Sequence, residues 1–367
     1  MTSKDQIVGT ASHHTLQKFD IFEKYIKAWA QKLLNYSNCQ KIVFIDCMSN
    51  SGEYRDSEGK NVYGTPVRAA KILSDYAYQY PNKEIVLYFN DNSAEKIELL
   101  KSIIKFRERS NYHIDFGIGD GNKYLDRICG DFVGRDGTHY LLIYDPFDAS
   151  ICWPSLVHYL NNWGEVIINH MVSDTARAVR VAKSPQAIEK YENTYLASLK
   201  SLVECGSDKK LFEERIKDII KSLRAGRKQC YIASFPFFNS QNTLLYNLLF
   251  CSGNIEGLKL YKKTVWQQFE GKSSEKKTHF SSEQQVFDFS GNDIVSYSSD
   301  EGCYTVHDIA DYVFKAFKGK GEVSLKDIWS MLDEHPIFPS DGFKPQIKKD
   351  LAERYGAIVK QSSIVFP

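Results

Sequence analysis

The chain has 367 residues, which is enough for about two domains of ordinary size. Its 43% hydrophobic and 13% aromatic residues can fill a core, so the composition excludes a mainly disordered protein. Lys and Arg number 47 against 46 for Asp and Glu, so the whole chain is not drawn to a polyanion. Any contact with nucleic acid would need a local basic patch.

Eight cysteines are scattered along the chain, without a C-x-x-C pair or a local metal-binding spacing. We therefore expect reduced thiols and no metal site. The N-terminus lacks the apolar run of a signal peptide, and no stretch approaches ~20 consecutive apolar residues. These features predict a cytoplasmic protein that does not enter a membrane.

The first predicted element is an amphipathic helix over residues 13–34, where apolar residues recur at helical spacing between charged ones. His14 and Lys18 lie one turn apart on this helix and share a face. Spacing alone favours a solvated helix start over a binding site for this pair.

A buried parallel strand is predicted over residues 42–45, with Asp46 where the strand runs out into a loop. In a doubly wound sheet, ligands bind at the carboxyl ends of the strands. Asn50 and Gly52 can take positive φ, so the loop can turn sharply and bring its N–H groups close to a ligand. The stretch is typical of a nucleoside-binding crevice, although an ordinary strand connection has the same pattern more often.

The next predicted elements are a polar loop over 55–63, a helix with Thr65 as N-cap before a proline, a strand over 84–89 and a helix over 94–109. Asp91 follows the second strand, where nucleoside-binding α/β domains hold the ribose hydroxyls. Taken alone, it is as typical of a turn or a helix cap.

A third strand over 112–118 precedes Asp120, whose carboxylate could accept a hydrogen bond from an adenine amino group. Asp120-Gly121 is equally an ordinary turn signal.

The fourth strand, over 139–144, runs directly into Asp145, Pro146, Phe147 and Asp148. An exocyclic amine is a poor nucleophile, so an enzyme that methylates one must orient it with acceptors and hold its ring by stacking. Asp145 supplies the acceptor, Pro146 a fixed backbone and Phe147 a stacking face. The alternative is a strand that stops at a proline with a phenylalanine packed beneath it.

The second half of the chain continues the sheet around a charged helical region. The predicted elements are a strand over 164–171, helices within 175–227, a strand over 229–235, a strand or helix over 244–251 and a helix over 257–269.

The region over 271–300 is rich in Ser, Lys, Gln and Asp, which predicts a linker or exposed loop. Beyond it, the order helix, strand, helix, helix, strand over 301–367 is that of a winged helix. Its last helix would present Lys344, Lys348 and Lys349 outward as a groove-facing surface for nucleic acid. A protein-contact module is the alternative.

Taken together, these landmarks resemble the three-Cys-motif partner family (TcmP), which itself resembles S-adenosylmethionine-dependent methyltransferases of the Rossmann type. The matching pieces, in chain order, are HHTLQKFDIFEKYIKAW, FIDCMSNSGEY, YGTPVRAA, YFNDNSAEKIELL, GDGNKYL, LLIYDPFD and LLYNLLF, followed by the winged-helix-like tail.

The resemblance implies that Asp46 and Gly52 belong to the first cofactor-binding motif. It also implies that Asp91 corresponds to the ribose-binding acid and that Asp120 corresponds to the position that contacts the adenine. It implies that Asp145, Pro146 and Phe147 face the methyl acceptor, and that Lys18 matches a family lysine able to pair with the cofactor's carboxylate. The chain departs from the family pattern at several positions: Cys47 and Asn50 replace glycines, Phe19 replaces a His and Asp148 replaces a Gly.

The sequence therefore predicts an α/β, Rossmann-like methyltransferase fold over 1–270 with a helical insertion at about 175–227, a linker over 271–300 and a winged-helix-like domain over 301–367. The expected function is S-adenosylmethionine-dependent methylation of a nucleic-acid base in DNA or RNA, with an adenine N6 amine most plausible. The alternative is a catalytically inactive module of the same fold that binds a partner protein or a nucleotide, for example in a phage-defence or mobile-element system. The expected partners are DNA or RNA and a three-Cys-motif protein.

Overall fold

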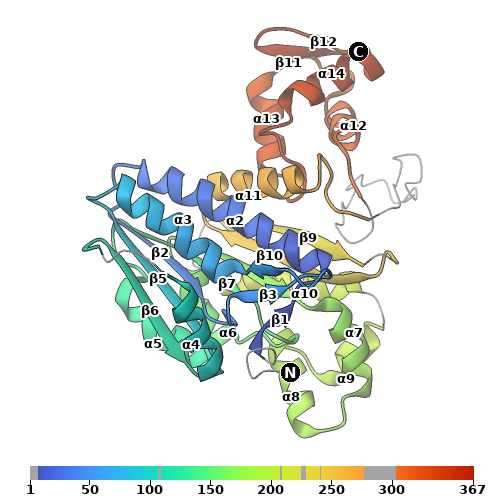
Figure 1. The fold of residues 1–367 in the computed structure, drawn as a ribbon. Coiled ribbons are helices and arrows are strands. Elements are labelled where there is room, and N and C mark those ends of the chain that lie inside the picture. Colours follow the sequence, from blue (N-terminus) through green and yellow to red (C-terminus); the bar gives the residue numbers. More distant parts are fainter. Residues whose placement is uncertain (1–6, 106–108, 207–208, 225–228, 240, 277–302) are drawn as a thin grey trace.

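The computed structural model describes residues 7–105, 109–206, 209–224, 229–239, 241–276 and 303–367 (Figure 1). A seven-stranded sheet with the order β6-β5-β2-β7-β8-β10-β9 forms its centre. The strands are β2 (Lys41–Asp46), β5 (Glu84–Asp91), β6 (Tyr112–Ile118), β7 (Thr138–Tyr144), β8 (Gly164–His170), β9 (Tyr231–Phe238) and β10 (Leu244–Ser252).

The first five of these strands are mutually parallel, and β10 pairs antiparallel with both β8 and β9. Numbered in chain order, these five strands lie in the order 3-2-1-4-5, that of a doubly wound nucleotide-binding sheet. Of the two strands that follow, β10 runs in the opposite direction and β9 runs parallel to the first five. This arrangement confirms the predicted fold class, a Rossmann-like methyltransferase fold. The strand order reverses beside β2, so the carboxyl ends of β2, β5 and β7 border the expected crevice.

Helices cover both faces of the sheet (Figure 1). One face carries α2 (His13–Leu34), α3 (Thr65–Gln79), α4 (Ala94–Ile103) and α11 (Ile255–Gln268). The other carries α5 (Gly121–Phe132), α6 (Trp153–Leu160), α7 (Val172–Val181), α8 (Pro185–Tyr195), α9 (Leu199–Glu204) and α10 (Lys209–Leu223), the last four falling in the predicted helical region.

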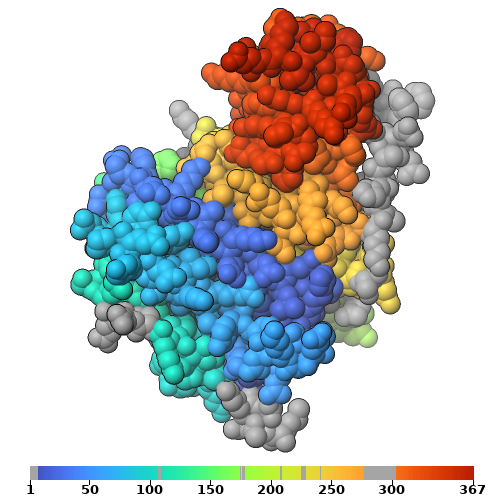
Figure 2. All heavy atoms as spheres, turned by 45° about the horizontal axis from the view of Figure 1, so that its top comes forward, coloured from blue at the N-terminus to red at the C-terminus, as the bar shows by residue number. Residues whose placement is uncertain are grey.

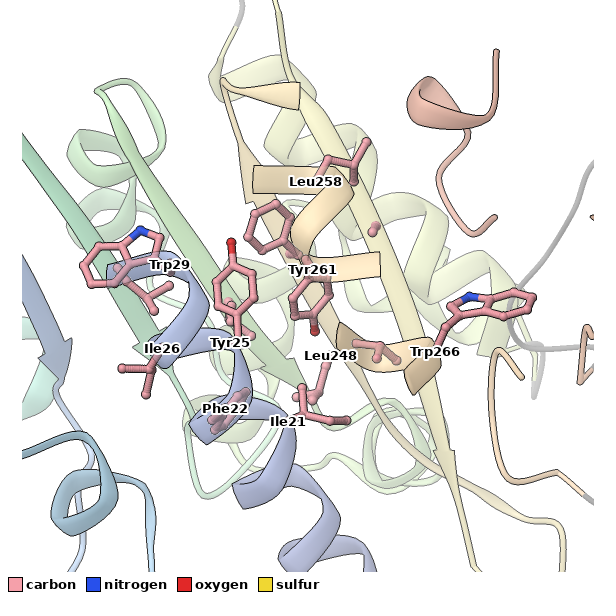
Figure 3. Packing of buried hydrophobic residues seen from close by; sticks show 14 of the residues in the cluster. Ile21, Phe22, Tyr25, Ile26, Trp29, Leu248, Leu258, Tyr261 and Trp266 are labelled. Atoms are coloured by element: carbon pink, nitrogen blue, oxygen red, sulfur yellow. The ribbon is translucent and has the colours of Figure 1, made fainter. Parts of the chain in front are cut away.

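Aromatic packing fixes α2 and α11 against the sheet (Figure 3). Tyr25 of α2 meets Tyr261 of α11 edge to face at 5.4 Å between ring centroids, and Tyr261 stacks on Phe250 of β10 at 4.6 Å. All three rings are fully buried. Burial of each is worth about 2 kcal/mol or more, so this contact holds the middle of α2 in a defined place over the sheet.

Several local expectations were wrong. Residues 55–63 are not simply a polar loop, because they belong to a small sheet of β1 (Gly9–Thr10), β3 (Glu53–Arg55) and β4 (Asn61–Tyr63). Thr65 is not the N-cap of α3, which has Gly64 there. A Cβ at Gly64 would lie 2.6 Å from the Tyr54 ring, so the close approach of that ring explains the glycine. Helix α4 ends at Ile103 rather than at residue 109. Of the two alternatives left open for residues 244–251, the structure has the strand.

The C-terminal region contains the elements that the sequence indicated. These are α12 (Val306–Phe317), β11 (Gly321–Ser324), α13 (Leu325–Glu334), α14 (Lys344–Tyr355), β12 (Ile358–Val359) and β13 (Ser363–Phe366). The strands form an antiparallel sheet with the order β11-β13-β12. The winged-helix interpretation of this unit stays a prediction, and most of the predicted linker lies outside the described residues.

The C-terminal region sits on α11 (Figure 2), where two buried side chains attach it. The Lys262 ammonium lies 2.6 to 3.0 Å from the carbonyls of Leu332, Asp333, His335 and Phe338. Trp266 donates its indole N–H to the Ile337 carbonyl at 3.0 Å. Both regions therefore share one continuous apolar core.

Three findings concern membrane-spanning helices, disulfides and metal ligands. Across the described segments, no helix has the length and apolarity needed to traverse a bilayer. All eight cysteines are free. The described residues contain no group of three or more His, Cys, Asp or Glu side chains arranged to hold a metal ion.

Candidate functional site

Three carboxylates from three neighbouring strands meet at the carboxyl edge of the sheet. Asp46 ends β2, Asp91 ends β5 and Asp145 follows β7. The strand register sets Asp46 opposite Phe89 and Ile143, so Asp91 and Asp145 each lie two residues beyond it at the same edge. Burial raises the pKa of Asp46 to about 7, and the nearby Asp145 adds to the shift. A hydrogen bond from the Met48 N–H and the charge of Lys18 act in the opposite direction. The structure thus brings together acids that the sequence placed only by their strand positions.

Asp145 is held from both sides. The Lys18 ammonium lies 2.5 Å from its Oδ2, and Asn169 donates its Nδ2–H to Oδ1 at 2.6 Å. Lys18 is almost buried, with 11% of its side chain exposed, and it lies 5.5 Å from the centroid of the Tyr246 ring. Lys18 and Asp145 were predicted as separate site residues, and Asn169 was not predicted. The position of Asn169 near the carboxyl end of the parallel strand β8 was the signal that could have indicated it.

The loop after β2 has the predicted turn geometry. Asn50 and Gly52 have φ of 57° and 72°, which confirms that both take the left-handed region. A Cβ at Gly52 would lie 2.5 Å from Leu100 Cδ1, so helix packing alone already requires the glycine. The tight turn aims the Asn50 N–H at Asp91.

Asp91 has both carboxylate oxygens in use. Its Oδ2 accepts from the Asn50 N–H and its Oδ1 from the Ser93 N–H, each at 3.0 Å, and the Lys96 ammonium lies 3.9 Å from Oδ1. The residue is 1% exposed. In this conformation Asp91 therefore fixes the loop, and because it is buried, contact with a ribose would require the loop around it to open.

Asp120 lies beside the same loop but has a structural task of its own. It is the N-cap of α5, where its Oδ1 accepts from the N–H groups of Asn122 and Lys123 at 3.0 and 2.9 Å. A Cβ at Gly121 would lie 2.8 Å from the Cys47 carbonyl oxygen, so the start of α5 packs directly on the loop. The Cys47 side chain is fully buried.

Tyr54 of β3 is a site residue that sequence reasoning missed. Burial raises the pKa of Tyr54, and the charges of Asp145 and Asp46 raise it further. Its ring packs against Phe19 of α2, with 5.0 Å between centroids. Because Tyr54 comes from the small sheet rather than from a strand of the central sheet, no strand-end pattern could have indicated it.

The segment after Asp145 presents one exposed aromatic ring. Pro146 is buried, whereas Phe147 is 66% exposed with the Lys96 ammonium 5.0 Å from its ring centroid. Asp148 is bound by Lys190 of α8 at 2.6 Å. Burial alone would raise the pKa of Asp148, but hydrogen bonds from Lys190 and Ser150 lower it, so this loop is tied to the helical region.

The charges at this edge do not balance. Asp46, Asp91 and Asp145 are three carboxylates, and Lys18 and Lys96 are the two ammonium groups that lie within 4 Å of them among the described residues. One negative charge is in excess when all are ionised, which agrees with the raised pKa of Asp46. The edge therefore suits a ligand that brings a positive charge.

The predicted basic surface of α14 is partly neutralised. Lys344 pairs with Asp341 at 2.9 Å, and Lys349 lies 4.0 Å from Glu353. Lys344 and Lys348 lie 5.6 and 5.9 Å from the Trp329 ring centroid. Two lysines of α14 thus flank an aromatic ring that comes from α13.

Comparisons with known proteins add structural neighbours only. No family model and no curated protein matches the sequence. Protein LPL1258 of family DUF519 from Legionella pneumophila aligns over 68% of this chain and 92% of its own, with 11% identity and a TM-score of 0.39. Human methyltransferase-like protein 13 in complex with SAH aligns over 68% and 92%, with 12% identity and a TM-score of 0.29. PKMT2 from Rickettsia typhi in complex with AdoHcy aligns over 89% and 75%, with 12% identity and a TM-score of 0.29. The fold assignment itself rests on the strand order and pairing.

Proposed function

We propose that this chain is an S-adenosylmethionine-dependent methyltransferase that acts on an exocyclic amine of a nucleic-acid base, an adenine N6 amine being the best candidate. The observation that carries the proposal is the excess negative charge where Asp46, Asp91 and Asp145 meet at the carboxyl edge of the sheet. S-adenosylmethionine carries a sulfonium and an ammonium group, and when bound it supplies an electrophilic methyl group.

The residues present fit this cofactor by charge and position. Asp46 and Asp91 border the loop that contains Gly52, and they would complement the cationic ligand. Asp120 lies next to the same loop, and its Oδ2 would accept from the adenine amino group while Oδ1 keeps the cap of α5. Lys18, now bound to Asp145, would be the partner for the ligand's carboxylate.

The acceptor side would be formed by Asp145, Pro146 and Phe147. One oxygen of Asp145 would accept an N–H of the amine in place of the Lys18 ammonium, which orients the nitrogen lone pair. Asn169 would keep the other oxygen fixed through its 2.6 Å hydrogen bond. The exposed ring of Phe147 would stack on the base, and the buried Pro146 would fix the backbone between them.

Methyl transfer to nucleic acid tests the proposal directly. Radiolabelled S-adenosylmethionine is incubated with the full chain and mixed DNA and RNA, and the wild type is expected to label one of the two polymers. Asp145→Ala should lose labelling by at least about 100-fold, because the amine is no longer oriented. Asp136→Ala, a change at an exposed acid in the loop before β7, is the control and should keep activity. Labelling that survives Asp145→Ala would remove this residue from the chemistry.

We further propose that α14 helps to hold the polymer through Lys344, Lys348 and Lys349. Reversing Lys348 and Lys349 to Glu should weaken retention on DNA or RNA and flatten its dependence on salt. Reversal of Lys101, a lysine on α4, is the control and should leave retention unchanged. Equal retention by all three proteins would assign this surface to a protein partner instead.

A second candidate function rests on the state of Asp91. Backbone N–H groups bind both of its oxygens, and the residue is buried. This arrangement is the one expected in a loop that no longer opens for a cofactor. Under this proposal the chain is a non-catalytic module that binds a nucleotide or a protein partner, such as a protein with a three-cysteine motif. Absence of both cofactor binding and methyl transfer would favour it.

A further inference from the structure

Two cysteines lie close together beside β9 and β10, the last two strands in the sheet order, outside the proposed active site. Cys251 of β10 pairs with Ile232 of β9, and Cys230 stands two residues before Ile232, so the two cysteines are diagonal neighbours on one face. Their sulfur atoms are 3.9 Å apart. Cys251 is 1% exposed, whereas Cys230 is partly exposed, so one thiol of the pair can be reached from solvent.

A buried arginine completes the arrangement. Arg224, which follows α10, is 2% exposed, and its Nη1 lies 3.6 Å from Cys251 Sγ. Its Nη2 donates to the Gln229 carbonyl at 3.3 Å, and its Nε has no hydrogen-bond partner. A Cβ at Gly253 would lie 2.8 Å from Nη2, so the glycine makes room for the guanidinium.

The guanidinium makes no ion pair with a carboxylate within the part of the chain that the structure describes. A buried positive charge without a counter-charge is costly, and a thiolate is the group beside it that can supply one. A hydrogen bond from Cys251 lowers the pKa of Cys230 to about 7 despite its partial burial, and the charges of Arg224 and Lys221 lower it further. Near neutral pH the pair therefore shares one proton and one negative charge.

We propose that Cys230 and Cys251 form a peroxide-reactive thiol pair that closes reversibly into a disulfide. The Cys230 thiolate attacks one oxygen of hydrogen peroxide, the O–O bond breaks, and sulfenic acid forms with release of hydroxide. The Cys251 thiol then attacks the Cys230 sulfur, forming the S–S bond and expelling the hydroxyl group, which leaves as water with the Cys251 proton. The two electrons of the two thiols have then passed to the peroxide. At 3.9 Å the sulfur atoms are in contact, and forming the S–S bond requires the two residues to bring them to about 2 Å.

Peptide mass spectrometry of the full chain after treatment with hydrogen peroxide tests the proposal. The wild type should yield a Cys230–Cys251 cross-linked peptide that a dithiol reductant removes. Cys251→Ser should instead accumulate sulfenic acid at Cys230, trapped by dimedone. Cys205, a partly exposed thiol that donates to the Ser201 carbonyl, is the internal control and should react at least about tenfold more slowly.

The role of the arginine is tested separately. Arg224→Lys keeps the positive charge and should retain the reaction, whereas Arg224→Met should slow alkylation of Cys230 at pH 7 several-fold. If Arg224→Met does not fold, the pH dependence of Cys230 alkylation in the wild type decides, with a midpoint near 7 expected. Cys230 reacting no faster than Cys205, or peroxide giving no cross-linked peptide, would overturn the proposal.

Discussion

Replacing Asp46 by Asn should change how the stability of this protein depends on pH. Burial and the neighbouring carboxylates raise the pKa of Asp46 from 3.8 to about 7, so the folded state binds a proton that the unfolded state releases between these values. The stability that this proton contributes is complete below pH 4 and is lost as the pH rises through 7. Asn is isosteric, keeps an acceptor for the Met48 N–H and does not titrate.

The size of the effect follows from the shift. At about 1.4 kcal/mol per pKa unit, the wild type should lose about 2 to 3 kcal/mol between pH 5 and pH 8 through this group. The free energy of unfolding of Asp46→Asn, relative to wild type, should therefore rise by that amount over the same interval. Urea unfolding at the two pH values measures it.

Glu165 provides a matched comparison. Burial raises its pKa to about 7 as well, but it lies in β8 at the opposite end of the sheet and bonds to the Tyr25 hydroxyl. Glu165→Gln should produce a change of the same sign. If the difference between Asp46→Asn and wild type is the same at both pH values, the carboxylates do not interact as described and the charge argument for the site fails.

Three further predictions concern the scaffold. Gly52→Ala should destabilise the fold by several kcal/mol, because its Cβ would overlap Leu100, whereas Gly59→Ala, with φ of 78° and open space around it, should cost only about 1 to 2 kcal/mol in thermal or urea unfolding. Lys262→Met should leave buried carbonyls of the C-terminal region without a donor and cost a few kcal/mol, seen as faster hydrogen exchange over residues 325–338. Asp91→Asn should lower the melting temperature, because its amide cannot accept from both the Asn50 and Ser93 N–H groups.

The sequence was most informative where hydrophobic periodicity is strong and local. The helix over 13–34, the strand over 112–118 and the helices of the C-terminal region were predicted at or near their observed bounds. The positive φ of Asn50 and Gly52 was also predictable, because few residues tolerate that region. These features depend on residues close in the chain.

What could not be predicted depends on residues far apart in the chain. The ion pair between Lys18 and Asp145 joins residues 127 positions apart, and Tyr54 reaches the acids from a small sheet that local pattern did not reveal. Asp91 and Asp120 illustrate a second limit. Both stand at the expected strand ends, but their carboxylates accept hydrogen bonds from backbone N–H groups of the following residues. A sequence alone cannot distinguish a carboxylate that caps a turn or helix from one that contacts a ligand.

Calorimetric titration of the full chain with S-adenosylmethionine, at pH 7 in two buffers of different ionisation enthalpy, tests the central claim most directly. We predict saturable binding to one site with release of up to about half a proton, because the cationic ligand should drive the half-protonated Asp46 to its carboxylate. Asp46→Asn should abolish the proton release and Glu165→Gln should keep it. The absence of saturable heat with both S-adenosylmethionine and its demethylated product would contradict the claim that these acids form a cofactor site.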